Sequence, residues 1–196
     1  MEIFLNFLDY IKINVEYNFI LTLLIFFIFL LLYNSFSIPG NPIFIGATGY
    51  FFGIYIGYFI SIITLVLGSL IFFSFSKFFI KKIFPRISYK YVNNLENYIS
   101  NSSIEHLIIF RMIPGVPLFL QNLLLSLLNI TKIKFILSSI VGFTPLVFII
   151  VFVGNQLTNI DKLKNLSISD IFSFKYLIFI FFFIIFLLIR IIYKNK

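Results

Sequence analysis

The chain has 196 residues, of which 61% are hydrophobic and 11% are charged, and its formal net charge is +8. Its mean hydropathy of +1.09 excludes an ordinary soluble domain and predicts a membrane protein. The absence of cysteine excludes disulfides, thiolate metal sites and a thiol nucleophile. Nucleic-acid binding is not expected despite the positive charge, because the bases flank apolar segments and form no folded basic domain.

Residues 1–17 are predicted to form an interfacial N-terminal helix. Their apolar side chains recur at helical spacing, with Glu2, Asp9 and Glu16 off that stripe. The segment has no small-residue cleavage site and is not typical of a signal peptide. Residues 18–36 follow as the first predicted transmembrane helix, which is apolar on every side.

No charged side chain occurs from residue 17 to residue 76. One helical crossing needs only about 20 residues, so this run must enter the bilayer more than once. Residues 38–53 are broken by Pro39, Gly40 and Pro42, and they predict a re-entrant hairpin. Residues 54–80 then predict a second continuous span.

Residues 81–105 form the hydrophilic connection, and Ser102 with Glu105 makes a capping box that starts a helix. That helix must end near Met112 because Pro114 removes a backbone donor. Pro117 is a favourable first helical position and predicts a restart that runs to about residue 128. Residues 103–128 are therefore expected to be a second re-entrant hairpin, with its tip near the membrane midplane.

Two further spans are predicted at residues 135–154 and 174–193, separated by an extracytoplasmic loop at 156–173 and followed by a basic tail. Lysines and arginines gather in the 77–105 region and in the tail. By the positive-inside rule, both termini and the central connection are expected in the cytoplasm. The predicted fold is thus an all-α polytopic membrane protein with about four transmembrane helices and two re-entrant hairpins.

An internal repeat relates the two predicted hairpins. IPGNPIF at 38–44 and IPGVPLF at 113–119 agree at five of seven positions, at an offset of 75 residues. The hairpins are expected to enter from opposite faces, which is the pattern of an inverted repeat whose broken helices meet at a transport site. A chance match in a background rich in isoleucine and phenylalanine is the alternative.

Small residues follow the first proline cluster. Gly49, Gly53 and Gly57 are four apart, and Gly46 precedes them, so they predict a face where another backbone approaches closely. This face has two interpretations, tight helix packing alone or packing at a transport site, and both can hold together.

Arg111 is the arginine placed inside a predicted hairpin, and no acid of the predicted membrane segments is available to pair with it. A charge at this depth costs roughly 2.5–3.5 kcal/mol on insertion scales and requires a partner or a watery cavity. A phosphate suits a guanidinium, which binds two oxygens at once. Gln121 and Asn122 offer neutral hydrogen bonds nearby. The alternative is structural: Arg111 bonds freed backbone carbonyls or extends to the interface.

The residues around Arg111 resemble the signature of the VTT-domain family, also called the SNARE-associated Golgi protein family, whose bacterial branch includes DedA. Its arginine–isoleucine–proline and glutamine–asparagine pattern is matched by Arg111, Ile113, Pro114, Pro117, Gln121 and Asn122. Shorter patterns also occur: an aromatic four residues before Lys77, a small residue at Ser126 where the family has glycine, and the pair Gly142 and Pro145. The resemblance covers about residues 35–155, and residues 37–155 are predicted to be the VTT-like core.

The resemblance implies two re-entrant hairpins in an inverted repeat and the movement of phospholipids or lipid-linked phosphates between leaflets. It implies that the lipid head group meets the two proline tips, which comprise Arg111, Pro114, Gly115, Pro117, Gln121, Asn122, Pro39, Gly40 and Pro42. Hairpin packing is expected to involve Gly46, Gly49, Gly53, Gly57, Ser126, Gly142 and Pro145. The acids that suggest proton coupling in the DedA branch are missing from these segments.

Two other functions stay open: a small-solute or ion transporter on the same scaffold, and a non-transporting protein of membrane homeostasis or assembly. An enzyme is not expected, because the membrane segments lack a nucleophile with a base or a cluster of metal ligands. No cofactor or metal is expected. The expected partners are membrane lipids with phosphate-bearing or anionic head groups, with a possible homo-oligomer. The expected location is a cell membrane, in particular a bacterial inner membrane.

Overall fold

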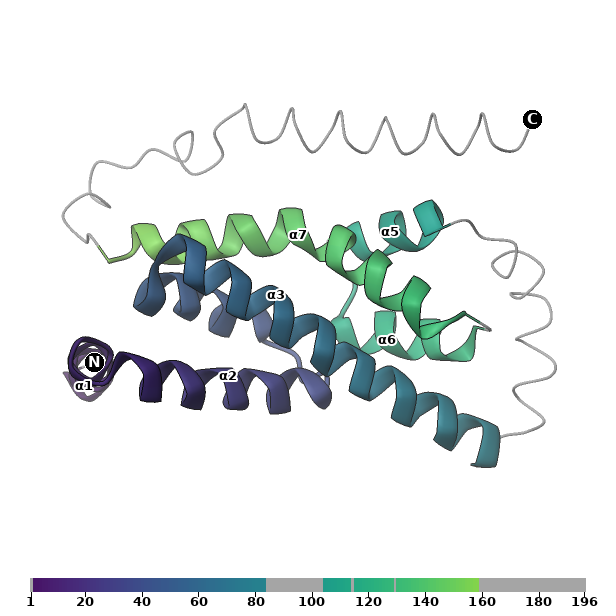
Figure 1. The fold of residues 1–196 in the computed structure, drawn as a ribbon, viewed down its shortest axis with the longest axis horizontal. Helices are drawn as coiled ribbons and strands as arrows, with labels where there is room; N and C mark the ends of the chain where they lie inside the picture. The colour runs from purple at the N-terminus through teal and green to yellow at the C-terminus, as the bar shows by residue number, and fades with distance from the viewer. Residues whose placement is uncertain (1, 84–103, 114, 129, 159–196) are drawn as a thin grey trace.

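The computed structural model describes residues 2–83, 104–113, 115–128 and 130–158, and these are helical apart from short connections. The helices, shown in Figure 1, are α1 (Glu2–Tyr17), α2 (Phe19–Ser35), α3 (Asn41–Ile83), α5 (Ile104–Met112), α6 (Leu118–Leu127) and α7 (Lys132–Gln156). The predicted capping residue Ser102, most of the 156–173 loop and the last predicted span lie outside the described residues.

Helix α3 is two helices joined at Gly53. This glycine has φ 76° and ψ 177°, a backbone conformation that is essentially restricted to glycine. Residues 41–52 double back on the following residues, since the Thr48 hydroxyl donates to the Gly57 carbonyl at 3.0 Å and lies 2.8 Å from the Ser61 hydroxyl. Residues 38–53 therefore contain one helical arm where the sequence predicted both arms of a hairpin.

The partner of that arm is α2. Edge-to-face ring contacts join Phe26 to Phe51 and Phe52, and Phe29 to Phe44. At the turn between the two arms, Tyr33 donates to the Pro39 carbonyl at 2.6 Å. The 17 residues of α2 rise about 25 Å, and α2 ends at mid-length of the bundle instead of running through it (Figure 1). The first hairpin is therefore α2 with residues 41–52.

Helices α5 and α6 form the second hairpin, which comes from the opposite end of the bundle (Figure 1). The turn glycines Gly40 and Gly115 occupy equivalent places in the two sequence copies, and both have positive φ, 102° and 86°. Each hairpin is followed by a long helix, residues 54–83 in the first copy and α7 in the second. In the described residues, each of the two sequence copies thus corresponds to a helical hairpin followed by a long helix.

The two long helices pack antiparallel at the centre. Tyr58 is 3.0 Å from the Thr144 hydroxyl, and the Phe73 ring lies 4.3 Å from the Phe135 ring, centroid to centroid. These helices and the arm at residues 41–52 share an apolar core of Ile45, Ile62, Leu65, Val66, Phe143, Val147 and Val151. This core fixes the spacing between the two hairpins.

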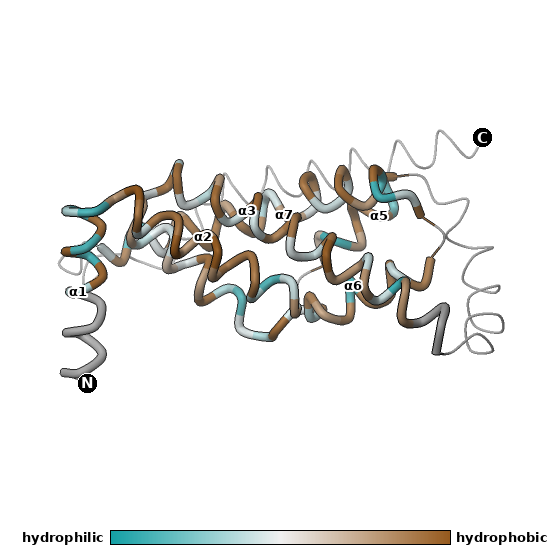
Figure 2. Tube along the Cα trace, turned by 60° about the horizontal axis from the view of Figure 1, so that its bottom comes forward, coloured by the Kyte–Doolittle hydropathy of each residue, from teal (hydrophilic) through white to brown (hydrophobic). Residues whose placement is uncertain are grey.

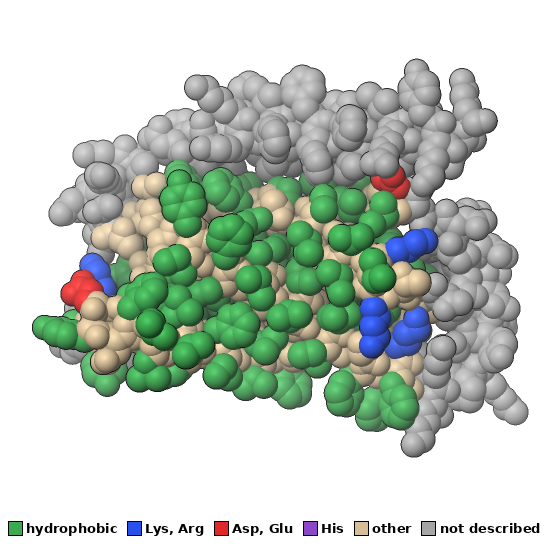
Figure 3. Space-filling view, in the orientation of Figure 1, with side chains coloured by type: hydrophobic (Ala, Val, Ile, Leu, Met, Phe, Trp, Pro, Cys, Tyr) green, Lys and Arg blue, Asp and Glu red, His purple; other side chains and the backbone are tan. Residues whose placement is uncertain are grey.

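The outer surface is apolar over the body and polar at the ends. Figure 2 shows hydrophobic residues along most of the tube, and Figure 3 shows charged side chains gathered at the two ends of one face. Two helices of the described part, Asn41–Phe79 and Lys132–Gln156, are long and apolar enough to cross a membrane, although the first contains the Gly53 reversal. These features agree with a helical membrane protein.

The end of α3 and helix α1 lie at opposite ends of the bundle (Figure 1). The sequence predicted the N-terminus and the 81–105 connection on the same side. The difference arises because α2 turns back at mid-length, which removes one expected crossing between the two.

Candidate functional site

The two hairpin tips meet inside the bundle. The Asn122 amide, on α6 of the second hairpin, donates to the Ser37 hydroxyl of the first tip at 2.9 Å. Asn122 is fully buried and Ser37 nearly so. This bond joins residues 85 positions apart in sequence, so the loops on either side of it form one polar site within an apolar body.

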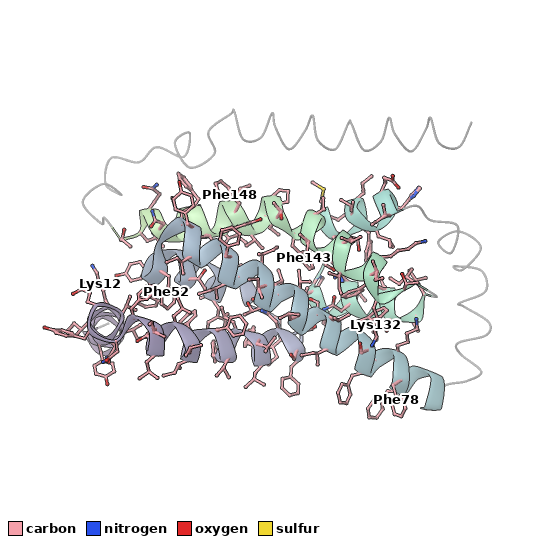
Figure 4. All side chains as sticks on the ribbon, in the orientation of Figure 1. Lys12, Phe52, Phe78, Lys132, Phe143 and Phe148 are labelled. Atoms are coloured by element: carbon pink, nitrogen blue, oxygen red, sulfur yellow. The ribbon has the colours of Figure 1, made fainter. Side chains whose placement is uncertain are left out.

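Arg111 lies at this meeting point, in the last turn of α5. Its side chain is only 2% exposed. Its Nη1 donates to Asn122 Oδ1 at 2.7 Å and, at 3.5 Å, to Gln121 Oε1. The guanidinium carbon lies 4.6 Å and 4.8 Å from the ring centroids of Phe135 and Phe143 on α7, which is within cation–π range. Figure 4 labels Phe143 midway along the bundle.

The Arg111 guanidinium is only partly satisfied. Its Nε and Nη2 are buried and have no hydrogen-bond partner among the described residues. These two nitrogens lie on the same edge of the guanidinium plane and together form the fork that binds carboxylate or phosphate through two parallel bonds. The arginine therefore bonds the protein amides through Nη1, and none of the described residues bonds its Nε–Nη2 edge.

Gly142 of α7 makes the position of Arg111 possible. A methyl group at residue 142 would overlap Arg111 Cβ and stand 3.0 Å from the Ile108 carbonyl oxygen. Helices α5 and α7 thus approach backbone to backbone at this point. The predicted packing role of Gly142 agrees with this contact, and its consequence is that the guanidinium lies directly against the α7 rings.

The chain matches the model of the VTT domain over residues 38–156. It belongs to the VTT-domain family. It is also 26% identical, over 146 residues, to the Transmembrane protein 41 homolog of Dictyostelium discoideum. That match covers 72% of this chain and 42% of the relative, so the chain spans less than half of that protein's length. No solved structure matches.

The predicted tip residues of this VTT domain are of two kinds: polar side chains that contact one another, and prolines and glycines that shape the turns. The second tip contributes Arg111, Gln121 and Asn122, which are in direct contact, and Gln121 also donates to the Val116 carbonyl at 3.3 Å. Prolines and glycines shape the two hairpin turns. In the first hairpin, Pro39 and Gly40 form the turn and Pro42 lies near the start of the helical arm that follows. In the second hairpin, Gly115 lies in the turn and Pro117 directly precedes α6. Pro114 lies outside the described residues.

The predicted packing residues mostly lie at close helix contacts. A methyl group at Gly49 would overlap the Val151 backbone carbonyl, and one at Gly57 would stand 2.7 Å from the Thr48 carbonyl oxygen. Gly46 has only ordinary contacts, but its carbonyl fills the space beside Gly154. The others differ in kind: Gly53 reverses the chain, Ser126 bonds the Leu123 carbonyl, and Pro145 lies inside α7.

Sequence reasoning missed the contribution of the first tip. Ser37, which has a positive φ of 51°, and Asn34, which is buried in the last turn of α2, both contribute polar groups there. The rings of Phe135 and Phe143 were also missed. Asparagine in an apolar helix was the available signal, since a polar amide inside a membrane segment marks either packing or a site.

A cleft lies at one end of the VTT domain. This cleft of about 530 Å³ is lined by Phe73, Ser74, Lys77, Phe78, Ile130, Thr131 and Lys132. Lys77 donates to the Ile130 carbonyl at 3.2 Å and lies over the Phe73 ring. Figure 4 shows Phe78 and Lys132 toward this end, away from Phe143. The Phe73 ring that lines the cleft lies 4.3 Å from the Phe135 ring, which in turn borders the Arg111 guanidinium.

Proposed function

We propose that this VTT-domain protein moves phosphate-bearing lipids between the two leaflets of a membrane, with Arg111 as the contact for the phosphate. The observation that carries the proposal is the unpaired edge of the guanidinium, Nε and Nη2. A buried cation without a counter-charge is strongly destabilising. A transient phosphate offsets that cost, whereas the protein side chains in contact with Arg111 are neutral amides and aromatic rings.

The proposed placement in the membrane follows from lengths. Residues 54–83 and α7 are the two crossings, at about 1.5 Å per residue against a hydrocarbon core of ~30 Å. The two hairpins are re-entrant and enter from opposite faces. The end that carries Lys77, Lys132 and Lys134 faces the cytoplasm by the positive-inside rule, which puts α1 on the other face. Residues 174–193 are proposed as a further crossing.

In this mechanism the tips separate, the head group reaches the Arg111 edge, and the acyl chains stay in the surrounding lipid. Nothing in the mechanism makes or breaks a covalent bond, so the protein is proposed to be a transporter and not an enzyme. The apolar face of the VTT domain offers the path for the acyl chains, because large hydrophobic side chains such as Ile43, Tyr55 and Phe59 are exposed along it.

The decisive test is a lipid-exchange assay with the purified full chain in liposomes. A phospholipid with a fluorescent acyl chain is added to both leaflets, and a membrane-impermeant reductant then bleaches the outer leaflet. Protein-free liposomes lose about half of the fluorescence. We expect liposomes with the wild-type protein to lose nearly all of it, because inner-leaflet lipid becomes accessible.

Two Arg111 substitutions separate charge from geometry. Arg111→Met keeps volume and removes a buried charge, so we expect it to fold at least as stably as wild type while exchange falls to the protein-free rate. Arg111→Lys keeps the charge but loses the fork, and we expect an intermediate rate. Lys134→Gln, an exposed change outside the site, is the control.

The same assay distinguishes the other functions. Wild-type exchange by the folded Arg111→Met variant would contradict the phosphate contact. Flux of entrapped phosphate or chloride without lipid exchange would indicate a small-anion transporter that uses the same guanidinium. Absence of both activities would favour a homeostasis or assembly role without transport.

A further inference from the structure

The buried polar site continues from Arg111 to Asn34. Asn34 is 1% exposed, and within the described part of the chain neither its Oδ1 nor its Nδ2 has a hydrogen-bond partner. Its Cβ and backbone lie against Gly68 of α3, where a methyl group would overlap them. The next residue, Ser69, is fully buried, and no described residue bonds its hydroxyl. Buried amides and hydroxyls are nearly always hydrogen-bonded in folded proteins, so these groups require an explanation.

Asn34 and Arg111 belong to one continuous chain of contacts. Ser37 donates to the Asn34 backbone carbonyl at 3.4 Å and accepts the Asn122 amide at 2.9 Å, and Asn122 accepts from Arg111 at 2.7 Å. Asn34 is therefore joined through its backbone to the contact between the tips, three residues before Ser37. A ligand that separates the tips at Ser37 enters beside the turn of α2 that carries the unsatisfied Asn34 amide.

The Arg111 edge and the Asn34 amide differ in chemistry. The arginine edge offers only donors, which suit a phosphate. The Asn34 side offers the acceptor Oδ1 and the donor Nδ2, and Ser69 can act as either. A phosphate cannot satisfy an amide oxygen, because an ionised phosphate diester has no hydrogen to donate. Full satisfaction of Asn34 requires a group that carries N–H or O–H.

We propose that the site prefers lipids whose head group carries a primary amine or hydroxyl beyond the phosphate, and that Asn34 makes this selection. A trimethylammonium head group has no hydrogen to donate to Oδ1 and leaves the Asn34 amide unsatisfied. This inference rests on the proposed lipid transport and adds the head-group class to it. Ethanolamine and glycerol head groups are expected to be favoured over choline.

The test uses the wild-type full chain in the liposome assay, with three probes that carry the same fluorescent acyl chain on ethanolamine, glycerol or choline phospholipids. We expect the choline probe to exchange about tenfold more slowly than the other two, which corresponds to one lost buried hydrogen bond. Equal rates for all three probes would overturn the selection by Asn34 while leaving lipid transport intact. No exchange of any probe would overturn the proposed function itself.

The Asn34→Leu variant, of similar volume, is expected to exchange all three probes at the same rate. Ser61→Ala is the matched control. It removes another buried hydroxyl of α3, but one that is already paired with Thr48, so its preference should equal that of wild type. An unchanged tenfold preference in Asn34→Leu would show that the selection lies elsewhere. Should Asn34→Leu not fold, Asn34→Ala removes the same amide without adding apolar volume, and it is expected to lose the preference in the same way.

Discussion

Replacing Gly142 with alanine tests whether α5 is held against α7 as described. The added methyl group would overlap Arg111 Cβ and lie 3.3 Å from Arg111 Cγ and 3.0 Å from the Ile108 oxygen. Carbon contacts are normally about 3.5–4.0 Å, so the helices must separate by about 1 Å. Overpacking of this kind costs about 1–3 kcal/mol of stability, and α5 is expected to move because it is the shorter helix.

Gly46→Ala is the matched control for this substitution. A methyl group at Gly46 would have Ile150 Cγ2 at 3.8 Å and the Ile150 oxygen at 3.9 Å as its nearest neighbours. These are ordinary contacts, and alanine favours the helix by roughly 0.5–1 kcal/mol relative to glycine. Both variants gain the helix propensity of alanine, and only Gly142→Ala adds the overpacking cost, so we expect Gly142→Ala to be less stable than Gly46→Ala by about 1–3 kcal/mol.

The assay measures the free energy of unfolding in mixed detergent micelles, followed by circular dichroism, together with lipid exchange. Gly142→Ala is expected to lower both stability and exchange, since a displacement of about 1 Å at a site can reduce a rate by tenfold or more. Gly46→Ala is expected to retain wild-type exchange. Equal stability of the two variants would refute the close contact of α5 with α7.

Three further predictions concern other parts of the VTT domain. Asn122→Asp places a carboxylate where an amide oxygen now lies 2.7 Å from Arg111 Nη1. The free energy of unfolding should rise, because Arg111 gains a counter-charge, and lipid exchange should fall. Unchanged exchange would argue against a phosphate at Arg111. Thr48→Val removes the hydroxyl that contacts Ile45, Gly57 and Ser61, which should lower the free energy of unfolding by about 1–2 kcal/mol, measured in the same micelles, with lipid preference unaltered. Exchange should be independent of an imposed proton gradient, because residues 17–95 and 106–160 contain no acid and Glu105 lies in the first turn of α5, at the other end of that helix from Arg111; a rate that follows the gradient would contradict this.

The sequence predicted two related proline–glycine turns and placed Gln121 and Asn122 near Arg111, but it did not predict that these two amides accept hydrogen bonds from the guanidinium. Two prolines and a glycine in the same order impose the same turn, and the two turn glycines indeed share a positive φ. Asn122 could be linked to Arg111 because both flank one short break. Local chemistry decides these features, so a local pattern reveals them.

The role of α2 could not be read from the sequence, because an apolar helix of 17 residues fits either a crossing or one arm of a hairpin. Its position is set by the ring contacts with residues 44, 51 and 52, which are tertiary. The contact of Ser37 with Asn122 could not be predicted either, because it is also a tertiary contact. The bond spans 85 positions, and no periodicity relates such distant residues.

The reversal at Gly53 has a consequence for how the protein is made. Topological signals in a nascent membrane protein come chiefly from flanking basic residues, and the stretch from residue 17 to 76 has none. Charged residues within this stretch therefore cannot determine which segment reverses direction. The reversal is expected to depend on the backbone conformation of Gly53 and on packing against neighbouring helices, so the first half of the molecule is expected to reach its final fold only after α7 has been synthesised.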